Sequence, residues 1–205
     1  MLATAGDQLA LRRLHFAGNL DGGAVESEAL SLMEVDAEGR IVALIAFDPD
    51  DRRAASREMS DRYLRSDEAP PGAAVGLAVM RALFDHDIES LRAALPGDYF
   101  VDDHRRFGMG RIDGATVFIK SLAALFEQSA DLVLECLYTV AVGDHGILDV
   151  AHMFGTLDAS GGDFESVYVR LLVFRGDGSA GLELFEVEDL DAARARFEAL
   201  RGNLA

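Results

Sequence analysis

Residues 35–59 read VDAEGRIVALIAFDPDDRRAASREM, and residues 173–197 read VFRGDGSAGLELFEVEDLDAARARF. The two stretches align without a gap. They share an order of signals: a strand, a Gly/Asp turn, a second strand ending in Phe47 or Phe185, an acidic run, and a helix that opens with Ala-Ala. A repeated order of this kind indicates a duplicated unit. The chain therefore holds one complete copy in its C-terminal two thirds, preceded by only the closing part of another copy.

The first copy extends from this stretch toward the N-terminus. Its expected strands lie at residues 9–17, 29–35 and 40–47, and its expected helix at 48–64. The polar stretch RSDEAPPG, residues 65–72, contains Pro-Pro, which interrupts both helix and sheet. We therefore expect a partial repeat over residues 1–66, a linker at 67–72 and a complete domain over 73–205.

The complete domain mixes helices with long strands. Helices are expected at 72–87, 88–95, 115–128 and 190–201, and strands at 99–106, 131–142, 147–156, 164–174 and 180–187. Asp87 and Asp113 are expected to cap the helices that follow them, Gly202 to cap the last helix, and residues 107–114 to form a loop. This order predicts an α+β fold, in which a curved antiparallel sheet is closed by helices into a half-barrel.

Composition excludes several classes of partner. The formal net charge of −17 argues against nucleic acid and against an anionic membrane surface. A single cysteine, Cys136, permits neither an internal disulfide nor a cysteine-based zinc site. No stretch approaches the roughly 18 apolar residues of a membrane helix. The chain is therefore expected to be soluble and cytoplasmic. Its 18 Arg and single lysine, Lys120, with abundant Ala, Gly and Asp, suggest a GC-rich bacterial genome.

A resemblance to a known superfamily rests on two segments, IESLRAAL at 88–95 and DYFVDDHR at 98–105, and on the strand that ends at Phe185-Glu186. Over residues 72–200 the chain resembles the nuclear transport factor 2-like superfamily, with its SnoaL-like and ketosteroid-isomerase-like enzymes. The run VDDHRRFGMGRIDGA is similar to tandem domains of this type attached to actinobacterial regulatory ATPases or cyclases. The resemblance implies a cone-shaped sheet around an apolar cavity, where some members perform acid–base chemistry and others only bind or scaffold.

The strand at 99–106 carries the densest polar cluster. Because side chains alternate along a strand, Asp102 and His104 share one face, while Tyr99 and Asp103 share the other. Laid over the isomerase-like pattern, His104 falls near the proton-shuttling aspartate of that family. His104 with Asp102 or Asp103 is therefore a candidate catalytic set, since a histidine beside a carboxylate is a workable general base. The alternative is a strand whose ions pair with one another and with solvent.

Five other residues are candidate ligand contacts, although each is also compatible with an ordinary core position: Tyr99, Tyr138, His152, Tyr168 and Arg170. A metal is not expected, because Asp102, Asp103 and His104 are adjacent and cannot all point at one ion. No phosphate-binding glycine-rich loop with Lys and Ser/Thr is present, and no cofactor is expected.

Two functions remain open. The first is a non-enzymatic domain that binds a small hydrophobic ligand or serves in assembly. The alternative is a cofactor-free isomerase, cyclase or epoxide hydrolase that uses His104 with an aspartate. Under that alternative, His104→Ala should abolish turnover or weaken ligand binding, while stability changes by no more than about 1 kcal/mol. A homodimer is expected through sheet faces, because residues 168–174 carry apolar side chains on both faces.

Residues 1–66 are not expected to fold alone, because three strands and one helix provide a small core and leave sheet edges open. A fragment of these residues should show no cooperative thermal transition as a monomer. Calorimetry combined with light scattering would measure this, and a sharp transition from a monomeric fragment would contradict it.

Overall fold

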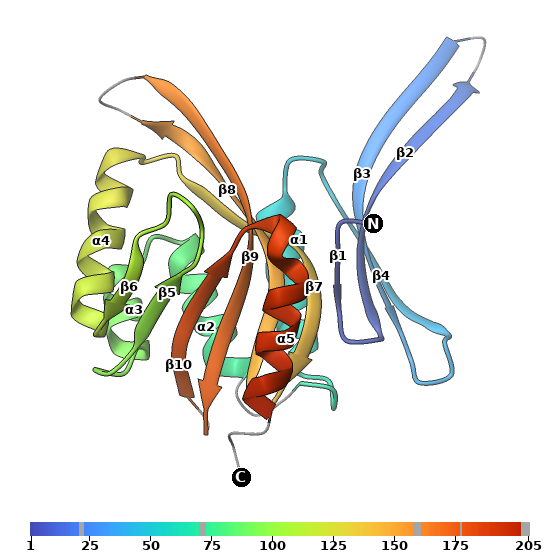
Figure 1. Ribbon diagram of the computed structural model, residues 1–205. Helices are drawn as coiled ribbons and strands as arrows, with labels where there is room; N and C mark the ends of the chain where they lie inside the picture. The colour runs from blue at the N-terminus through green and yellow to red at the C-terminus, as the bar shows by residue number, and fades with distance from the viewer. Residues whose placement is uncertain (21–22, 70–72, 158–160, 177, 202–205) are drawn as a thin grey trace. The chain divides into compact units, whose positions relative to one another are not determined.

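The computed structural model of the chain describes residues 1–20, 23–69, 73–157, 161–176 and 178–201. The fold is α+β, and the chain divides into two compact units (Figure 1). Unit 1 comprises Met1–Ala69, and unit 2 comprises Pro70–Ala205. The division falls within the linker expected from the sequence, of which residues 70–72 lie outside the described residues.

Unit 1 is a four-stranded antiparallel sheet with one helix on it. The strands, in the order β1-β2-β3-β4, are Ala3–Ala5, Leu9–Leu20, Gly23–Val35 and Ile41–Phe47, and helix α1 is Arg52–Tyr63. Leucines from β2 and β3 form the core beneath the helix, and Arg62 of α1 binds Glu34 of β3. β1 was not predicted, because three residues are too few to show an alternation. The sequence suggested a helix that starts at Asp48 and includes Pro49. In the structure the helix begins later, at Arg52.

The last helix of each unit buries side chains at positions that align in the sequence. Ala55 and Met59 of α1 align with Ala193 and Phe197 of the last helix, α5 (Leu190–Arg201). All four side chains are buried. In both units a strand pair is followed by a helix that buries an alanine and, one turn later, a larger apolar side chain.

Unit 2 is built on a six-stranded sheet with the order β6-β5-β10-β9-β8-β7. The strands are β5 Phe100–Asp103, β6 Gly110–Asp113, β7 Val133–Gly143, β8 Gly146–Leu157, β9 Gly162–Arg175 and β10 Gly178–Phe185. Neighbours are antiparallel except β5 and β10, which are parallel. Register shifts interrupt β7 twice and the β9–β10 pair once. Because each such bulge bends its strand, the sheet curves.

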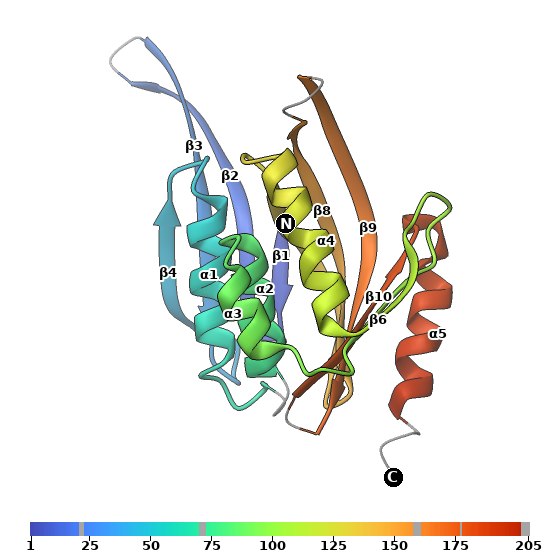
Figure 2. The same ribbon diagram turned by 90° about the vertical axis from the view of Figure 1, so that its left-hand side faces the viewer.

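Helices cover both faces of this sheet. On the inner face lie α2 (Ala73–Phe84), α3 (Ile88–Ala94) and α4 (Ala115–Gln128), whereas α5 lies on the outer face (Figure 2). In β9, Leu172 and Phe174 belong to the inner core, and Leu171 and Val173 to the outer core beside Phe197. The apolar side chains on both faces of β9 therefore have partners inside unit 2.

The predicted turn between β5 and α4 needs two corrections. The expected strand 99–106 ends at Asp103, and the expected loop 107–114 contains β6, which pairs with β5. The reason is that the Asp103 carboxylate accepts hydrogen bonds from the amides of Arg105 and Met109 and turns the chain back on itself. β6 has only four residues, so the sequence shows no clear strand pattern there.

The two predicted aspartate caps had different outcomes. Asp87 caps α3 as expected, because its Oδ1 accepts a hydrogen bond from the Ser90 amide at 3.0 Å. The prediction for Asp113 was wrong: Gly114 occupies the N-cap of α4 at a φ of 92°, and Asp113 instead accepts from Arg111 Nε at 2.9 Å. A side chain at Gly114 would be strained by that φ. The expected cap at Gly202 lies outside the described residues.

Gly146, at the start of β8, is required by close packing against β9. A Cβ at this position would lie 2.3 Å from the Leu172 carbonyl oxygen, which is a backbone atom and cannot rotate away. We expect Gly146→Ala to destabilise the chain by about 2 kcal/mol or more, lowering the melting temperature by several degrees. Gly97→Ala is the matched control, because nothing lies within 4 Å of a Cβ there. Equal melting temperatures of the two variants in calorimetry would contradict the packing argument.

Candidate functional site

A row of polar side chains crosses the inner face of the unit 2 sheet. Leu184 of β10 lies opposite Asp103 of β5 on one side and Arg170 of β9 on the other, and Arg170 lies opposite Asp149 of β8. Arg105 and Tyr168 flank these residues. We call Asp103, Arg105, Asp149, Tyr168 and Arg170 the inner polar row. They lie among the leucine, isoleucine and phenylalanine side chains of the inner core.

Arg170 and Asp149 form a bidentate ion pair. Nε and Nη2 of Arg170 donate to the two carboxylate oxygens of Asp149 at 2.9 and 2.7 Å, and the two side chains are only 3% and 5% exposed. Burial disfavours the charged guanidinium, but attraction to Asp149 outweighs it, so the pKa of Arg170 lies above its ordinary value. The pair is therefore a fixed, charged element inside an apolar core.

Asp103 and Arg105 form a second bidentate pair. The Asp103 carboxylate is fully buried and accepts from Nε and Nη2 of Arg105, both at 2.8 Å, and from the Met109 amide at 3.0 Å. Burial raises the pKa of Asp103, but the hydrogen bonds from Arg105 and Met109 outweigh it and hold the pKa below its ordinary value. Arg105 keeps 19% of its side chain exposed, more than its partner Asp103.

Tyr168 lies next to both cations. The guanidinium carbon of Arg105 stands 4.8 Å from the centre of the Tyr168 ring, and Arg170 lies two residues further along the same strand face. Burial raises the pKa of Tyr168, so at neutral pH its hydroxyl keeps its proton and is a hydrogen-bond donor. Burial likewise raises the pKa of the Cys136 thiol, beside Asp149 and Arg170, which leaves that thiol unreactive.

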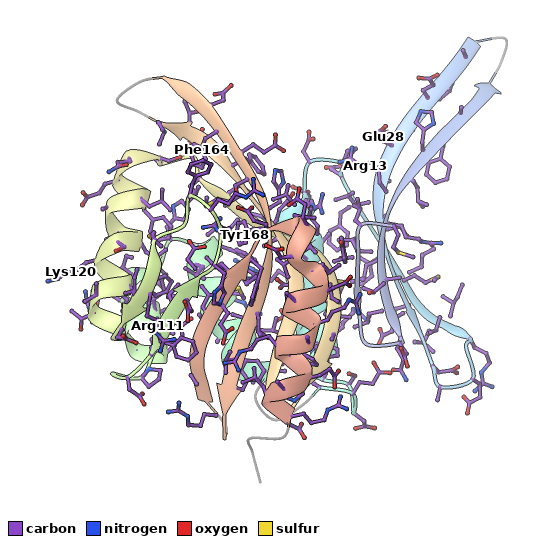
Figure 3. All side chains as sticks on the ribbon, viewed as in Figure 1. Arg13, Glu28, Arg111, Lys120, Phe164 and Tyr168 are labelled. Carbon is purple, nitrogen blue, oxygen red and sulfur yellow. The ribbon has the colours of Figure 1, made fainter. Side chains whose placement is uncertain are left out.

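The inner polar row can recognise an oxygen atom. It offers two guanidinium groups, each held in place by a carboxylate, and one phenolic donor. Partly buried apolar side chains, among them Phe126, Met153 and Phe164, pack against the same core. Tyr168 and Phe164 both project from β9 (Figure 3).

His104 and Asp102 lie on the opposite side of the sheet. His104 stacks on Phe185 of the outer core at 4.6 Å, and its ring nitrogens are 4.0 Å from Asp102 and 3.7 Å from Glu183. Glu183 in turn binds Arg196 of α5 at 2.8 Å. The histidine is 41% exposed. Of the three candidate catalytic residues, the structure thus separates Asp103 from Asp102 and His104.

The remaining candidates are also divided between the two faces. Tyr99 is 1% exposed in the inner core and stacks with Phe118 at 5.6 Å. Tyr138 is 43% exposed, opposite Val150 of the outer core. His152 bridges two carboxylates, with Nδ1 3.0 Å from Glu135 and Nε2 2.8 Å from Glu165. The structure therefore brings together Tyr168, Arg170, Asp103 and the core residue Tyr99, and leaves Tyr138 and His152 elsewhere.

Sequence reasoning missed Asp149 and Glu183. It placed Arg105 in the polar cluster, on the face of Tyr99 and Asp103, but did not name it as a site residue. A signal for Asp149 was present, because it is a single acid between Leu148 and Val150 and shares the strand face of Ile147 and Ala151. A charge in that position needs a buried partner, and Arg170 on the next strand was the available cation. Arg105 gave no such signal, since its role depends on the turn that follows β5.

Unit 1 contains a separate polar pocket of about 240 Å³, lined by Gln8, Glu34, Arg62, Arg65, Ser66, Asp67 and Glu68. Arg62 is already bound by Glu34 and Glu58, and the Asp7 amide donates to Glu68. Among the residues whose positions are described, no group of three or more His, Cys, Asp or Glu is arranged to hold a metal ion. Within the same residues, no helix combines the length and apolarity needed to cross a membrane.

Comparison with known proteins gave matches only among solved structures: no family model and no curated protein matches the chain. A putative SnoaL-like polyketide cyclase from Jannaschia is 20% identical, with a TM-score of 0.49 over 63% of this chain and 94% of that one. A ketosteroid isomerase-like protein from Catenulispora acidiphila is 16% identical, with a TM-score of 0.46 over 55% of this chain and 85% of that one. An NTF2-like protein of unknown function from Burkholderia pseudomallei is 16% identical, with a TM-score of 0.47 over 58% and 94%.

Proposed function

We propose that unit 2 is a non-enzymatic domain that binds a small, mainly apolar molecule through a carbonyl or carboxylate group, at the inner polar row. The observation that carries this proposal is the buried ion pair of Arg170 and Asp149. A buried ion pair is often no more stable than apolar side chains of similar volume. Its presence in an otherwise apolar core is therefore better explained by recognition than by stability.

The neighbouring groups support the same function. Asp103 fixes Arg105 beside Tyr168, so that a second cation and a protonated hydroxyl lie near Arg170 without further rearrangement. Groups held in place before binding lose little entropy on binding. Arg105 is the most exposed member of the inner polar row, at 19% of its side chain.

The enzymatic alternative is a His/Asp acid–base isomerase, cyclase or epoxide hydrolase. It is favoured by the proximity of His104 to Asp102 and Glu183. However, these three residues lie on the outer side of the sheet, whereas Tyr168 and Arg170 lie on the inner side. A substrate held by the inner polar row could not reach His104 through the sheet. We therefore expect His104→Ala to leave ligand binding unchanged, in contrast to the expectation from sequence.

A first prediction separates stability from recognition in the ion pair. Asp149→Leu alone should cost about 3–5 kcal/mol, because it leaves the Arg170 guanidinium buried without a partner. The double variant Asp149→Leu/Arg170→Met should recover most of that stability, since both charges are replaced by apolar groups. Thermal unfolding of the full chain would measure both effects. A double variant as unstable as the single one would mean that the pair is required for folding.

A second prediction concerns the ligand. Octanoate should raise the melting temperature of the full chain more than 1-octanol does, because a carboxylate accepts stronger, charge-assisted hydrogen bonds from guanidinium groups than a neutral hydroxyl does. A ligand at 100 times its dissociation constant stabilises the folded state by about 2.7 kcal/mol, which is a readily measured shift. Tyr168→Phe and Arg105→Met should each reduce the octanoate shift, and His104→Ala should retain it.

Native mass spectrometry of the purified chain provides an independent measurement. An added small-molecule mass should be present on the wild-type chain and on His104→Ala, and should be lost from Tyr168→Phe. Loss of the bound mass from His104→Ala, with Tyr168→Phe unaffected, would move the site to the outer side and favour the enzymatic alternative.

A further inference from the structure

The sheet of unit 1 has a helix over one of its faces. Helix α1 lies against β2 and β3, over the face that holds the buried residues Leu11, Leu30 and Leu32 (Figure 2). In the described part of unit 1 α1 is the only helix, so the opposite face has none from this unit. We call that opposite face the open face. Its side chains alternate with the buried leucines and include Arg12, Leu14, Phe16, Ser31, Met33 and Leu44.

The alignment of the two copies identifies the counterpart of the open face in unit 2. Phe47 of β4 aligns with Phe185 of β10, which belongs to the outer core beneath α5. Leu44 of the open face aligns with Leu182, which belongs to the inner core beneath α2, α3 and α4. Leu44 is 64% exposed, whereas Leu182 is 6% exposed. The open face therefore corresponds to the inner face of unit 2, without the helices that cover it there.

A single charged side chain lies among these apolar residues. Where β2, β3 and β4 pair regularly, Arg12 is the only charged residue on the open face, and it lies opposite Ser31. Nε of Arg12 and Oγ of Ser31 are buried and have no hydrogen-bond partner among the described residues. The neighbouring Arg13, on the other face, is paired with Glu28 at 3.0 Å. Arg12 thus lacks the carboxylate that its neighbour has.

The strand register places Ser31 where unit 2 has Arg170. Ser31 lies opposite Ala46 of β4, and Arg170 lies opposite Leu184 of β10. Ala46 and Leu184 align in the sequence. The same row of residues therefore crosses both sheets at the same height.

On the next strand of that row, Arg12 of β2 takes the place of Asp149 of β8. The row of unit 2 contains a cation and a carboxylate, which pair with each other, whereas the row of unit 1 contains only a cation. A partner that covers the open face removes the Arg12 guanidinium from water, which costs free energy unless the partner supplies a carboxylate. A second copy using the same face would bring another Arg12 and no carboxylate. Charge therefore favours a different polypeptide.

We propose that the open face of unit 1 binds an amphipathic helix of a partner protein, and that the apolar side of this helix carries a glutamate or aspartate that pairs with Arg12. The helix takes the role that α2, α3 and α4 have in unit 2. Exposed apolar side chains of the open face, among them Phe16 and Leu44, provide its packing surface. The inference concerns unit 1 and does not rest on ligand binding by unit 2.

Helix α4 provides a probe, because it packs on the corresponding face of unit 2 through Phe118, Ile119 and Leu122. Two synthetic peptides of residues 115–128 carry Leu122→Glu or Leu122→Lys and are titrated into the full chain by calorimetry. The Leu122→Glu peptide should bind about tenfold more tightly, a difference of about 1.4 kcal/mol, because only this peptide offers Arg12 a carboxylate. Equal affinities, or no binding of the Leu122→Glu peptide at about 1 mM, would overturn the proposal.

Variants of the full chain locate the contact. Arg12→Lys should keep the preference for the Leu122→Glu peptide, Arg12→Met should bind both peptides alike, and Arg12→Glu should prefer the Leu122→Lys peptide. Leu44→Gln should weaken binding of the Leu122→Glu peptide several-fold. Val117→Gln is the matched control and should not, because Val117 is an exposed apolar residue on α4 of unit 2. A preference for the Leu122→Glu peptide that persists in Arg12→Met would show that Arg12 is not the recognising group.

Two further measurements distinguish other occupants of the open face. In sedimentation velocity, a dimer that dissociates in Leu44→Gln but persists in Val117→Gln would show that a second copy covers this face. An octanoate-induced rise in melting temperature that is lost in Arg12→Met would show that the face takes a small carboxylate in place of a helix. Either result overturns the proposal.

Discussion

The buried ion pair between Arg170 and Asp149 constrains the rest of unit 2, because both side chains must be placed opposite each other inside an apolar core. Two charges in a core are tolerated only when they pair with each other in good geometry and their remaining hydrogen-bonding groups are satisfied. The inner helices provide the enclosure, and the pairing of β8 with β9 places the two residues opposite each other. The outer helix α5 covers the other side of the same strands through Ala193 and Phe197. Under the proposed function, a ligand oxygen would meet two guanidinium groups that are already held in place by carboxylates.

The sequence predicts the larger elements of this fold well, because long strands and amphipathic helices repeat their signals over many residues. Helix α4 and strands β7 to β9 lie close to their expected positions. The short strands β1 and β6 are missed, since three or four residues cannot establish a period. The cap of α4 is misassigned because Asp113, a good capping residue by type, is engaged by Arg111, and the backbone at Gly114 adopts a positive φ.

For the candidate site, the sequence predicts which residues share a face of a strand, but not which residues of distant strands come into contact. Alternation correctly separates Tyr99 and Asp103 from Asp102 and His104, because that separation needs only the geometry of a strand. It does not show which face points inward, since helices bury both faces of the sheet and both faces carry charges. Asp103 and Arg105 are close in sequence, and their pairing is local. The contact of Arg105 with Tyr168 joins residues far apart in the chain and depends on the complete order of strands.

That order of strands has a consequence for how the protein is made. β10 lies in the interior of the sheet, between β5 and β9, yet it is the last strand of the chain to leave the ribosome. Until it emerges, the β5–β6 hairpin and the β7–β8–β9 meander cannot be joined, and each exposes an apolar edge. Pairing of β5 with β10 closes a long loop, which makes this step slow relative to local hairpins. All four strands of unit 1 precede the strands of unit 2 in the chain, so the sheet of unit 1 contains no such delayed strand.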